Sequence, residues 1–294
     1  GDGCLMEGIS HEVCSLAGTL RLSKLVVLYD DNGISIDGEV KNWFADDTVR
    51  RFQAYGWNVI AGIDGHDVEA LDRAIAMARE WAVNGRDGRF APTLIQCRTV
   101  IGKGSPNRAG TAKVHGEPLG PDEIRATRAA MLAADGMGEP WQMPDDVRKA
   151  WDAREQGARV RGAWADMFGA YRARFPKQAA EFERRMRGEL PADWSDIVHR
   201  MVGDVVAKAE NIATRKASQN ALNHLGPALP ELLGGSADLT GSNLTDFKGS
   251  GALRVDETFV PGRHVNFGVR EFGMSGILNG LALHGGFVPY GGTF

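Results

Sequence analysis

Two short segments near the start of the chain carry oxygen atoms that could hold a hard cation. Asp2 stands between two glycines, and Asn32 follows a pair of aspartates and precedes Gly33. About 28 residues separate the two segments, close to the length of one strand–helix–strand crossover. Such a crossover would bring Asp2 and Asn32 together at the carboxyl edge of a parallel sheet, where ligands bind. Carboxylate, amide and backbone carbonyl oxygens are ligands that Mg²⁺ shares with phosphate and water, so we expect a magnesium site here.

Either segment alone is an ordinary turn sequence. Together, at this spacing, they match the signature of thiamine diphosphate binding, in which Gly-Asp-Gly is followed by Asn after roughly 25 to 30 residues. The combination therefore favours a cofactor site over two unrelated turns.

Three further side chains are of types that could do chemistry, although each by itself is more often a solvated surface residue. Glu271 lies at the start of a predicted helix, where a carboxylate usually offsets the helix dipole. Arg215 also lies at a predicted helix start, and a guanidinium beside free backbone N–H groups could clamp a phosphate. His115 lies in a loop flanked by glycine and proline, where it could stabilise charge on an oxygen atom.

The elements that would position these residues alternate along the first hundred residues. A continuous apolar run at residues 25–29 predicts a strand buried on both faces, and the turn at 30–33 ends it. The pattern also predicts strands at 57–60 and 93–100 and helices at 9–22 and 68–83. Strands that alternate with helices indicate right-handed crossovers and a parallel sheet.

A run rich in Arg, Glu and Ala from residue 121 to about 211 predicts a helical arm. Pro121 suits a first helical position, and Pro176 and Pro191 divide the run. This arm separates the first α/β region from a second one.

In the second region, Thr214 is expected to cap a helix that Gly226 and Pro227 end. A strand at 264–267 and a helix at 270–284 follow. The predicted fold class is therefore α/β, with parallel-sheet domains that have helices on both faces and are joined by a helical arm.

Composition places the chain among ordinary globular proteins. It has 294 residues, a net charge of −4 and 43% hydrophobic residues, so no strong field would draw nucleic acid or a membrane surface. No apolar run is long enough to cross a bilayer, and no secretory signal is visible. The three cysteines lack a CxxC pair, which fits free thiols in a reducing cytoplasm. Both ends of the chain look cut, so a fragment is expected.

Six segments of the sequence together resemble transketolases, in the order of that family and over essentially the whole chain: GDGCLMEGISHEVCSLAG, YDDNGISIDG, GTAKVHGEPLG, TRKASQNAL, GGSADLTGSNLT and FGVREFGM. The resemblance implies a diphosphate-binding domain at 1–185 that lacks its N-terminal part. It also implies a helical linker and the truncated start of a pyrimidine-binding domain at 186–294.

The resemblance implies a transferase of the pentose phosphate pathway. Such an enzyme moves a two-carbon ketol unit reversibly from a ketose phosphate to an aldose phosphate through a carbanion of thiamine diphosphate. It implies Mg²⁺ as metal, with Ca²⁺ or Mn²⁺ as alternatives, and a cytoplasmic homodimer with active sites at the subunit interface. A chain of this span is expected to be inactive alone, because half of the cofactor pocket would be absent.

The resemblance also assigns roles by motif. The metal ligands would be Asp2, Asn32 and the carbonyl of Ile34. The cofactor would contact Gly3, Asn32, Ile101, His115, Asp238 and Phe294. Glu271 would be the catalytic acid, His115 would touch both cofactor and donor sugar, and Arg215 and Ser242 would hold the substrate phosphate. Glu7 and Glu12 resemble acidic residues of the family's subunit interface.

One departure and two alternatives remain open. Ala112 stands where the family often has His, so a second contact from that loop is in doubt. Enzymes that use the same cofactor, such as dihydroxyacetone synthase, phosphoketolase and deoxyxylulose phosphate synthase, share the GDG and Asn pattern, although the later segments favour transketolase. A non-catalytic transketolase-like interaction module is the alternative from another class.

Overall fold

The computed structural model describes residues 1–132 and 141–294, which form two compact units, Gly1–Trp151 and Asp152–Phe294. The domain division predicted between residues 185 and 186 stays a prediction.

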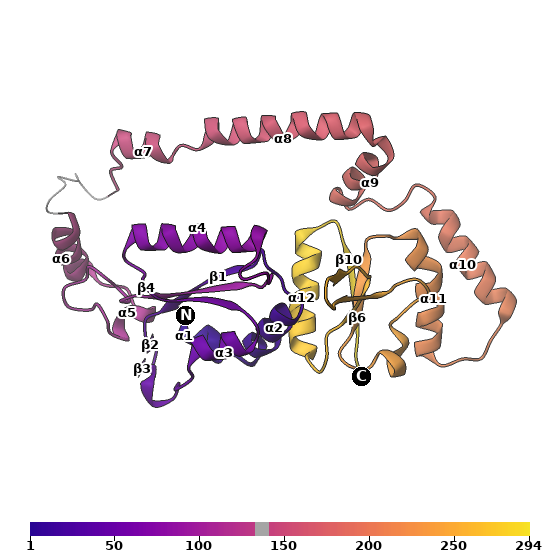
Figure 1. The fold of residues 1–294 in the computed structure, drawn as a ribbon, viewed down its shortest axis with the longest axis horizontal. Helices are drawn as coiled ribbons and strands as arrows, with labels where there is room; N and C mark the ends of the chain where they lie inside the picture. The colour runs from indigo at the N-terminus through magenta and orange to yellow at the C-terminus, as the bar shows by residue number, and fades with distance from the viewer. Residues whose placement is uncertain (133–140) are drawn as a thin grey trace. The chain divides into compact units, whose positions relative to one another are not determined.

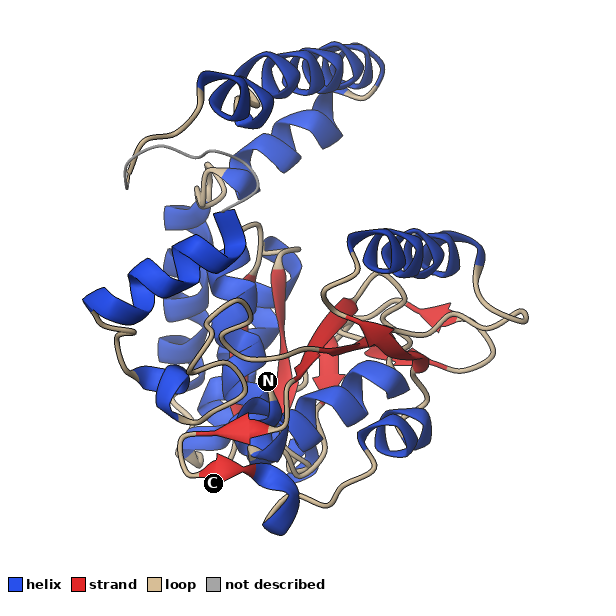
Figure 2. Ribbon diagram, turned by 90° about the vertical axis from the view of Figure 1, so that its left-hand side faces the viewer, coloured by secondary structure: helices blue, strands red, loops and turns tan. Residues whose placement is uncertain are grey.

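The first unit is built on a parallel sheet of three strands in the order β1 (Val26–Asp31), β5 (Thr93–Arg98) and β4 (Asn58–Asp64). Helix α4 (Val68–Asn84) covers one face of the sheet (Figure 1). The opposite face carries α1 (Asp2–Met6), α2 (Gly8–Thr19) and α3 (Thr48–Ala54). The predicted parallel sheet with helices on both faces is confirmed for this unit, and helices flank the strands in Figure 2 as well.

Side chains of the central strand β5 alternate between two cores, because successive residues of a strand point to opposite faces. Ile95 and Cys97 pack against Ala74 and Ala78 of α4. The other core contains Leu5, Ala17, Tyr29, Phe52, Trp57 and Leu94. Leu94 and Ile95 are both fully buried, so both faces of β5 are covered.

Strand β1 differs from its prediction in two ways. It continues through Asp30 and Asp31, for which the sequence predicts a turn, because both residues keep their pairing with β5. The turn itself is confined to the next two residues, where Gly33 has a φ of +68° that glycine adopts without strain. Burial on both faces is wrong as well, since Leu28 is 52% exposed. In the described part of the chain β1 pairs only with β5 and is an edge strand.

The remaining elements of the first unit are short or peripheral. A hairpin of two short strands and a 3-10 turn follow β1: β2 (Ile34–Ser35), β3 (Gly38–Glu39) and η1 (Val40–Asn42). Three helices follow β5: α5 (Lys113–Gly116), α6 (Pro121–Leu132) and α7 (Asp145–Trp151).

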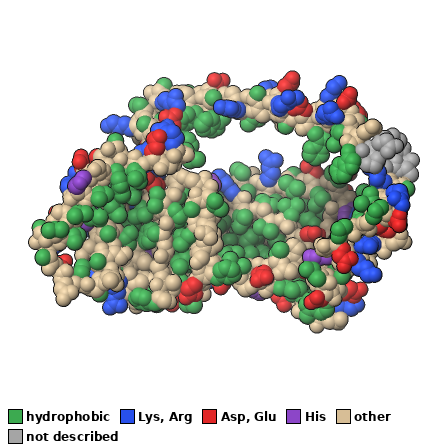
Figure 3. Space-filling view, turned by 180° about the vertical axis from the view of Figure 1, so that it is seen from behind, with side chains coloured by type: hydrophobic (Ala, Val, Ile, Leu, Met, Phe, Trp, Pro, Cys, Tyr) green, Lys and Arg blue, Asp and Glu red, His purple; other side chains and the backbone are tan. Residues whose placement is uncertain are grey.

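The helical arm predicted from residue 121 to about 211 includes residues 133–140, which lie outside the described residues. Its part in the second unit is confirmed. It comprises α8 (Arg154–Arg174), α9 (Pro176–Met186) and α10 (Trp194–Lys208). Pro176 is the first residue of α9, and Pro191 lies between α9 and α10, as expected. Hydrophobic side chains remain exposed on both units, those of α8 among them (Figure 3). No helix within the described residues is long and apolar enough to span a membrane.

Helix α11 (Thr214–Ala228) begins and ends differently from its prediction. Ala213 is the last residue with extended backbone, so Thr214 is already helical and does not cap the helix. The helix also runs past Gly226 and Pro227. Gly226 serves packing here, because a Cβ at this position would lie 2.4 Å from the ring of Phe247.

The second sheet has five strands in the order β10 (Val288–Gly292), β6 (Leu232–Ser236), β9 (His264–Asn266), β7 (Ala252–Val255) and β8 (Phe259–Val260). The first four are parallel to one another. Figure 1 shows α11 and α12 (Glu271–His284) on opposite sides of this sheet, as the predicted fold class requires.

A cluster of ion pairs ties α9 to the start of β6. Arg184 Nη1 and Nη2 donate to the two carboxylate oxygens of Glu231 at 2.9 and 3.0 Å. The same guanidinium donates to both oxygens of Glu181, one helical turn earlier. The side chains of Arg184 and Glu231 are only 13% and 5% exposed, so this pair lies inside the unit.

Candidate functional site

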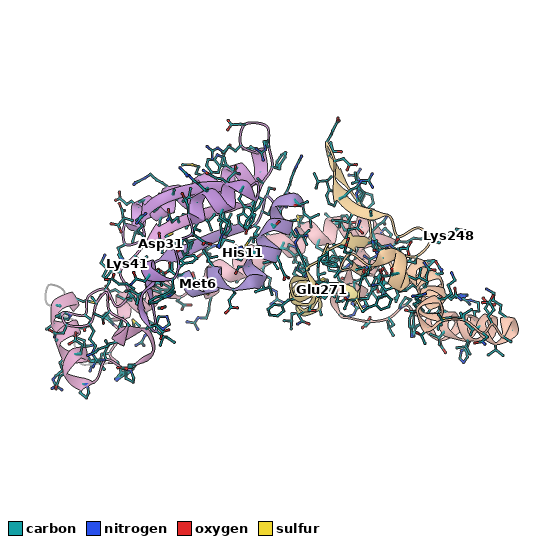
Figure 4. The ribbon with its side chains drawn as sticks, turned by 90° about the horizontal axis from the view of Figure 1, so that it is seen from below. Met6, His11, Asp31, Lys41, Lys248 and Glu271 are labelled. Carbon is teal, nitrogen blue, oxygen red and sulfur yellow. The ribbon has the colours of Figure 1, made fainter. Side chains whose placement is uncertain are left out.

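A cavity of about 730 Å³ lies at the carboxyl edge of the first sheet. Its walls come from α1, the end of β1, the β2–β3 hairpin, the start of α3 and the end of β5. Three of the predicted site residues line it, namely Asp2, Asn32 and Ile34. Asp31 and Lys41, labelled in Figure 4, line it as well.

Asp2 is a buried carboxylate at the base of this cavity, with 3% of its surface exposed. One of its oxygens accepts a hydrogen bond from the Tyr29 hydroxyl at 2.6 Å. The other accepts the Gly33 backbone N–H at 3.1 Å. Both donors are neutral, and no lysine or arginine within the described residues makes an ion pair with Asp2. A buried carboxylate without a cationic partner is costly, which fits a site for a metal ion.

Asn32 and Ile34 offer the other two predicted oxygen atoms beside Asp2. The Ile34 backbone N–H donates to Asn32 Oδ1 at 2.9 Å. This bond uses one lone pair of the amide oxygen, so the second lone pair is available to a metal ion. No three His, Cys, Asp or Glu side chains of the described residues cluster as a metal centre. A metal here would therefore rely on one carboxylate, one amide and one carbonyl, a set of hard ligands that suits Mg²⁺ bound together with phosphate and water.

Two residues to which the sequence interpretation gave no role stand next to Asp2. Tyr29 is 4% exposed, and burial together with the hydrogen bond and charge of Asp2 raises the pKa of its hydroxyl. Asp31 Oδ1 lies 3.3 Å from the same hydroxyl, and its Oδ2 accepts Gln96 Nε2 at 2.7 Å. The available signal was alternation along β1, since Tyr29 and Asp31 must share a face of the strand.

Gly3, Ile101 and His115 are not among the residues that line this cavity. Gly3 is exposed on α1. Ile101 lies in the loop after β5, where its carbonyl accepts the N–H of Gly110, a residue of the cavity wall. His115, expected in a loop, is exposed in the single turn of α5, which begins directly after Ala112.

The loop after β5 is held from both sides. His66 has no metal-ligand spacing in the sequence, and its Nε2 accepts the Val100 backbone N–H at 2.8 Å. At the other end, the buried carboxylate of Glu123 accepts hydrogen bonds from the Ser105 hydroxyl and from the backbone and side chain of Asn107. These hydrogen bonds, that of Ser105 first, hold the pKa of Glu123 below its ordinary value.

In the second unit, three predicted residues follow the carboxyl ends of neighbouring parallel strands. Asp238 lies two residues after β6, Glu271 opens the helix after β9, and Phe294 lies two residues after β10. The strand ends are in register, with Ser236 opposite both Gly292 and Asn266. The fold thus brings the three residues to one edge of the sheet, the edge at which ligands bind in such folds. Glu271, labelled in Figure 4, is exposed in the first turn of α12.

The loop that carries Asp238 and Ser242 is fixed by the buried hydroxyl of Ser236. This hydroxyl donates to the Gly292 carbonyl and accepts from the Leu239 N–H and from the side chain of Asn243. Asp238 has a φ of +63°, a conformation that Asp tolerates better than most residues. Such backbone strain gathers at functional sites.

The two predicted phosphate-binding residues lie on neighbouring elements of the second unit. Arg215 is exposed in the first turn of α11, and Ser242 is exposed in the adjoining turn η2 (Thr240–Leu244). Gln219 of α11 hydrogen-bonds Asp246 just after this turn, which ties the helix to it. Glu7 and Glu12, by contrast, lie in the first unit, where Glu7 is the N-cap residue of α2 and Glu12 lies within that helix.

Family models match both units. The thiamine diphosphate binding domain of transketolase matches residues 1–191, and the pyrimidine binding domain of transketolase matches residues 210–294. Transketolase 2 of Vibrio parahaemolyticus is 54% identical and Transketolase 1 of Vibrio cholerae 53% identical, each over 294 residues. Each match covers 100% of this chain and 42% of the relative, so the chain spans about two fifths of their length.

Solved structures agree with these matches. A transketolase from Leishmania mexicana has a TM-score of 0.85 at 40% identity. A transketolase from Pichia stipitis in complex with sedoheptulose 7-phosphate has a TM-score of 0.86 at 36% identity. Each of these matches covers 100% of this chain and 42% of the chain in the solved structure.

The fold and the candidate site together define a protein of two α/β units built on parallel sheets, with some of the candidate residues at the carboxyl edge of each sheet. This chain belongs to the transketolase family.

Proposed function

We propose that the protein to which this chain belongs is a transketolase, which transfers a two-carbon ketol unit from a ketose phosphate to an aldose phosphate. Family membership over both units supports this proposal. The structural observation that carries it is the buried carboxylate of Asp2, which has two neutral donors and faces a cavity large enough for a diphosphate.

Asp2, Asn32 and the Ile34 carbonyl would hold Mg²⁺, with Ca²⁺ or Mn²⁺ as alternatives. Gly3 and Ile101 would contact the cofactor from the first unit, and Asp238 and Phe294 from the second. Thiamine diphosphate, when bound, supplies the nucleophilic carbon that carries the two-carbon unit.

The remaining candidate residues would donate protons or hydrogen bonds to the cofactor and the substrate. Glu271 would hold a proton on its carboxyl group and donate it to the aminopyrimidine ring of the cofactor. His115 would donate a hydrogen bond to a sugar oxygen as negative charge develops there. Arg215 and Ser242 would bind the substrate phosphate, since the guanidinium and the hydroxyl donate to phosphate oxygens.

The same proposal includes the setting of the enzyme. It would be a cytoplasmic homodimer of the pentose phosphate pathway whose sites lie between subunits, with Glu7 and Glu12 near that interface. The domain division at residues 185 and 186 belongs to this proposal as well. Nucleic acid and membranes are not among the expected partners.

Metal-dependent cofactor binding tests the site. In the full-length protein, Asp2→Ala and Asn32→Ala should each abolish thiamine diphosphate binding measured by calorimetry in the presence of Mg²⁺, because each removes an oxygen ligand. Asp72→Ala, an exposed carboxylate on α4, is the matched control and should bind normally. Unchanged affinity in both test variants would show that the cofactor site is elsewhere.

A further inference from the structure

We propose that Tyr29 is a positioning residue, whose hydroxyl holds the Asp2 carboxylate in the orientation that the metal ion requires. The inference rests on the proposed function, since it concerns the same cation site. It goes beyond the predicted ligands because Tyr29 itself would not touch the metal.

Strand geometry brings the participants together. Tyr29 and Asp31 alternate with outward-facing neighbours on β1, and Tyr29 is in register with Gln96 on β5. All three side chains therefore leave the same face of the sheet. The ring of Tyr29 belongs to the core beneath this face, beside Phe52 and Trp57, so its position is set by packing. The hydroxyl is the polar tip of a side chain that is otherwise anchored in the core.

Hydrogen bonding at this hydroxyl favours Asp2. A tyrosine hydroxyl has one proton to donate, and two carboxylates lie within reach. The distance to Asp2 Oδ1 is 2.6 Å and the distance to Asp31 Oδ1 is 3.3 Å, so the proton belongs to the Asp2 bond. Gln96 holds the other carboxylate through Asp31 Oδ2 at 2.7 Å.

Each oxygen of Asp2 is thereby held by one donor. Tyr29 occupies one lone pair of Oδ1, and the Gly33 N–H occupies one lone pair of Oδ2. A carboxylate has about four lone-pair sites, so each oxygen keeps one for a cation. A carboxylate fixed by two donors loses little ordering entropy when the metal binds, whereas one held by Gly33 alone would turn about its last bond.

The test uses the full-length protein and the substitution Tyr29→Phe, which removes the hydroxyl and keeps the ring. Magnesium is titrated at fixed thiamine diphosphate, and binding is followed by calorimetry. Loss of such an outer contact typically lowers metal affinity by about 10- to 100-fold, so the half-saturating Mg²⁺ concentration should rise by that factor. At saturating Mg²⁺, kcat should return to the level of the parent protein, because no ligand or reacting group has been removed.

Tyr55→Phe is the matched control. Tyr55 packs against the same core, its hydroxyl bonds His11 Nδ1 at 2.9 Å, and it does not line the cavity. Its half-saturating Mg²⁺ concentration should equal that of the parent. Thermal melting of all variants without metal shows whether the fold is kept.

The outcomes separate four cases. A rise of the half-saturating Mg²⁺ concentration confined to Tyr29→Phe supports the inference. If Tyr29→Phe titrates like the parent while Asp2→Ala loses binding, Tyr29 has no positioning role and the proposed function stands. If Tyr29→Phe binds weakly at every Mg²⁺ concentration and melts early, its role is only structural. Normal binding by Asp2→Ala would instead overturn the proposed site.

Discussion

The ion pair between Arg184 and Glu231 should be the main tie between helix α9 and the second sheet. Arg184→Met removes a guanidinium that makes two-pronged contacts with both Glu231 and Glu181. Afterwards the nearest cation to Glu231 is Arg185 Nε at 3.8 Å. Glu231 would then be a carboxylate of 5% exposure with almost no partner.

The expected cost follows from burial. Removing one partner of a buried ion pair costs about 3–5 kcal/mol, since the remaining charge is left desolvated. The contact to Glu181 adds little, because that side chain is 36% exposed and exposed pairs contribute about 0.2–1 kcal/mol. The free energy needed to open α9 locally should therefore fall by roughly 3–5 kcal/mol. Because 1.4 kcal/mol corresponds to about tenfold, the amide hydrogens of α9 should exchange about 10²- to 10³·⁵-fold faster.

Hydrogen exchange of the full-length protein, followed by mass spectrometry on peptides from Pro176–Met186, measures this opening. Arg187→Met is the matched control, because Arg187 pairs with Glu189 at exposures of 57% and 53%. Replacing Arg184 and Glu231 together by Met should recover much of the loss, since no buried charge remains. Equal exchange in Arg184→Met and Arg187→Met would refute the reasoning.

Three further predictions concern the site and its surroundings. Arg215→Ala should lower kcat/KM about ten- to a hundredfold for xylulose 5-phosphate and much less for hydroxypyruvate; equal losses would contradict a phosphate clamp. The lowered pKa of Glu123 means that its stabilisation is complete above its ordinary value of 4.5 and is lost as the pH falls through the lowered pKa. Glu123→Gln should therefore lower the melting temperature at neutral pH, and the difference from the parent should shrink in acid; a difference independent of pH would count against this. Full-length Asp2→Ala and Glu271→Ala proteins, mixed and reassembled, should regain roughly a quarter of all sites if each site uses both chains of a dimer, and no recovery in confirmed heterodimers would exclude that geometry.

Much of the fold could be predicted from local patterns. The helices over Val68–Asn84 and Glu271–His284 follow from periodicity and from the glycines after them, and the strand over Thr93–Arg98 follows from its apolar run. Boundaries failed where tertiary contacts outweighed local signals. Helix α11 runs past Gly226, where the missing side chain leaves room for the ring of Phe247 and does not end the helix.

The candidate site shows the same division. The oxygen-bearing residue types and the spacing of Asp2 and Asn32 are properties of the chain order, so the kind of chemistry could be predicted without any tertiary contact. It did not reveal that Tyr29 and Gly33 are the donors to Asp2, that His66 and Glu123 hold the loop after β5, or that β1 has an exposed face. Those facts depend on tertiary contacts, strand pairing and its register among them, which join residues far apart in the chain and which no local pattern encodes.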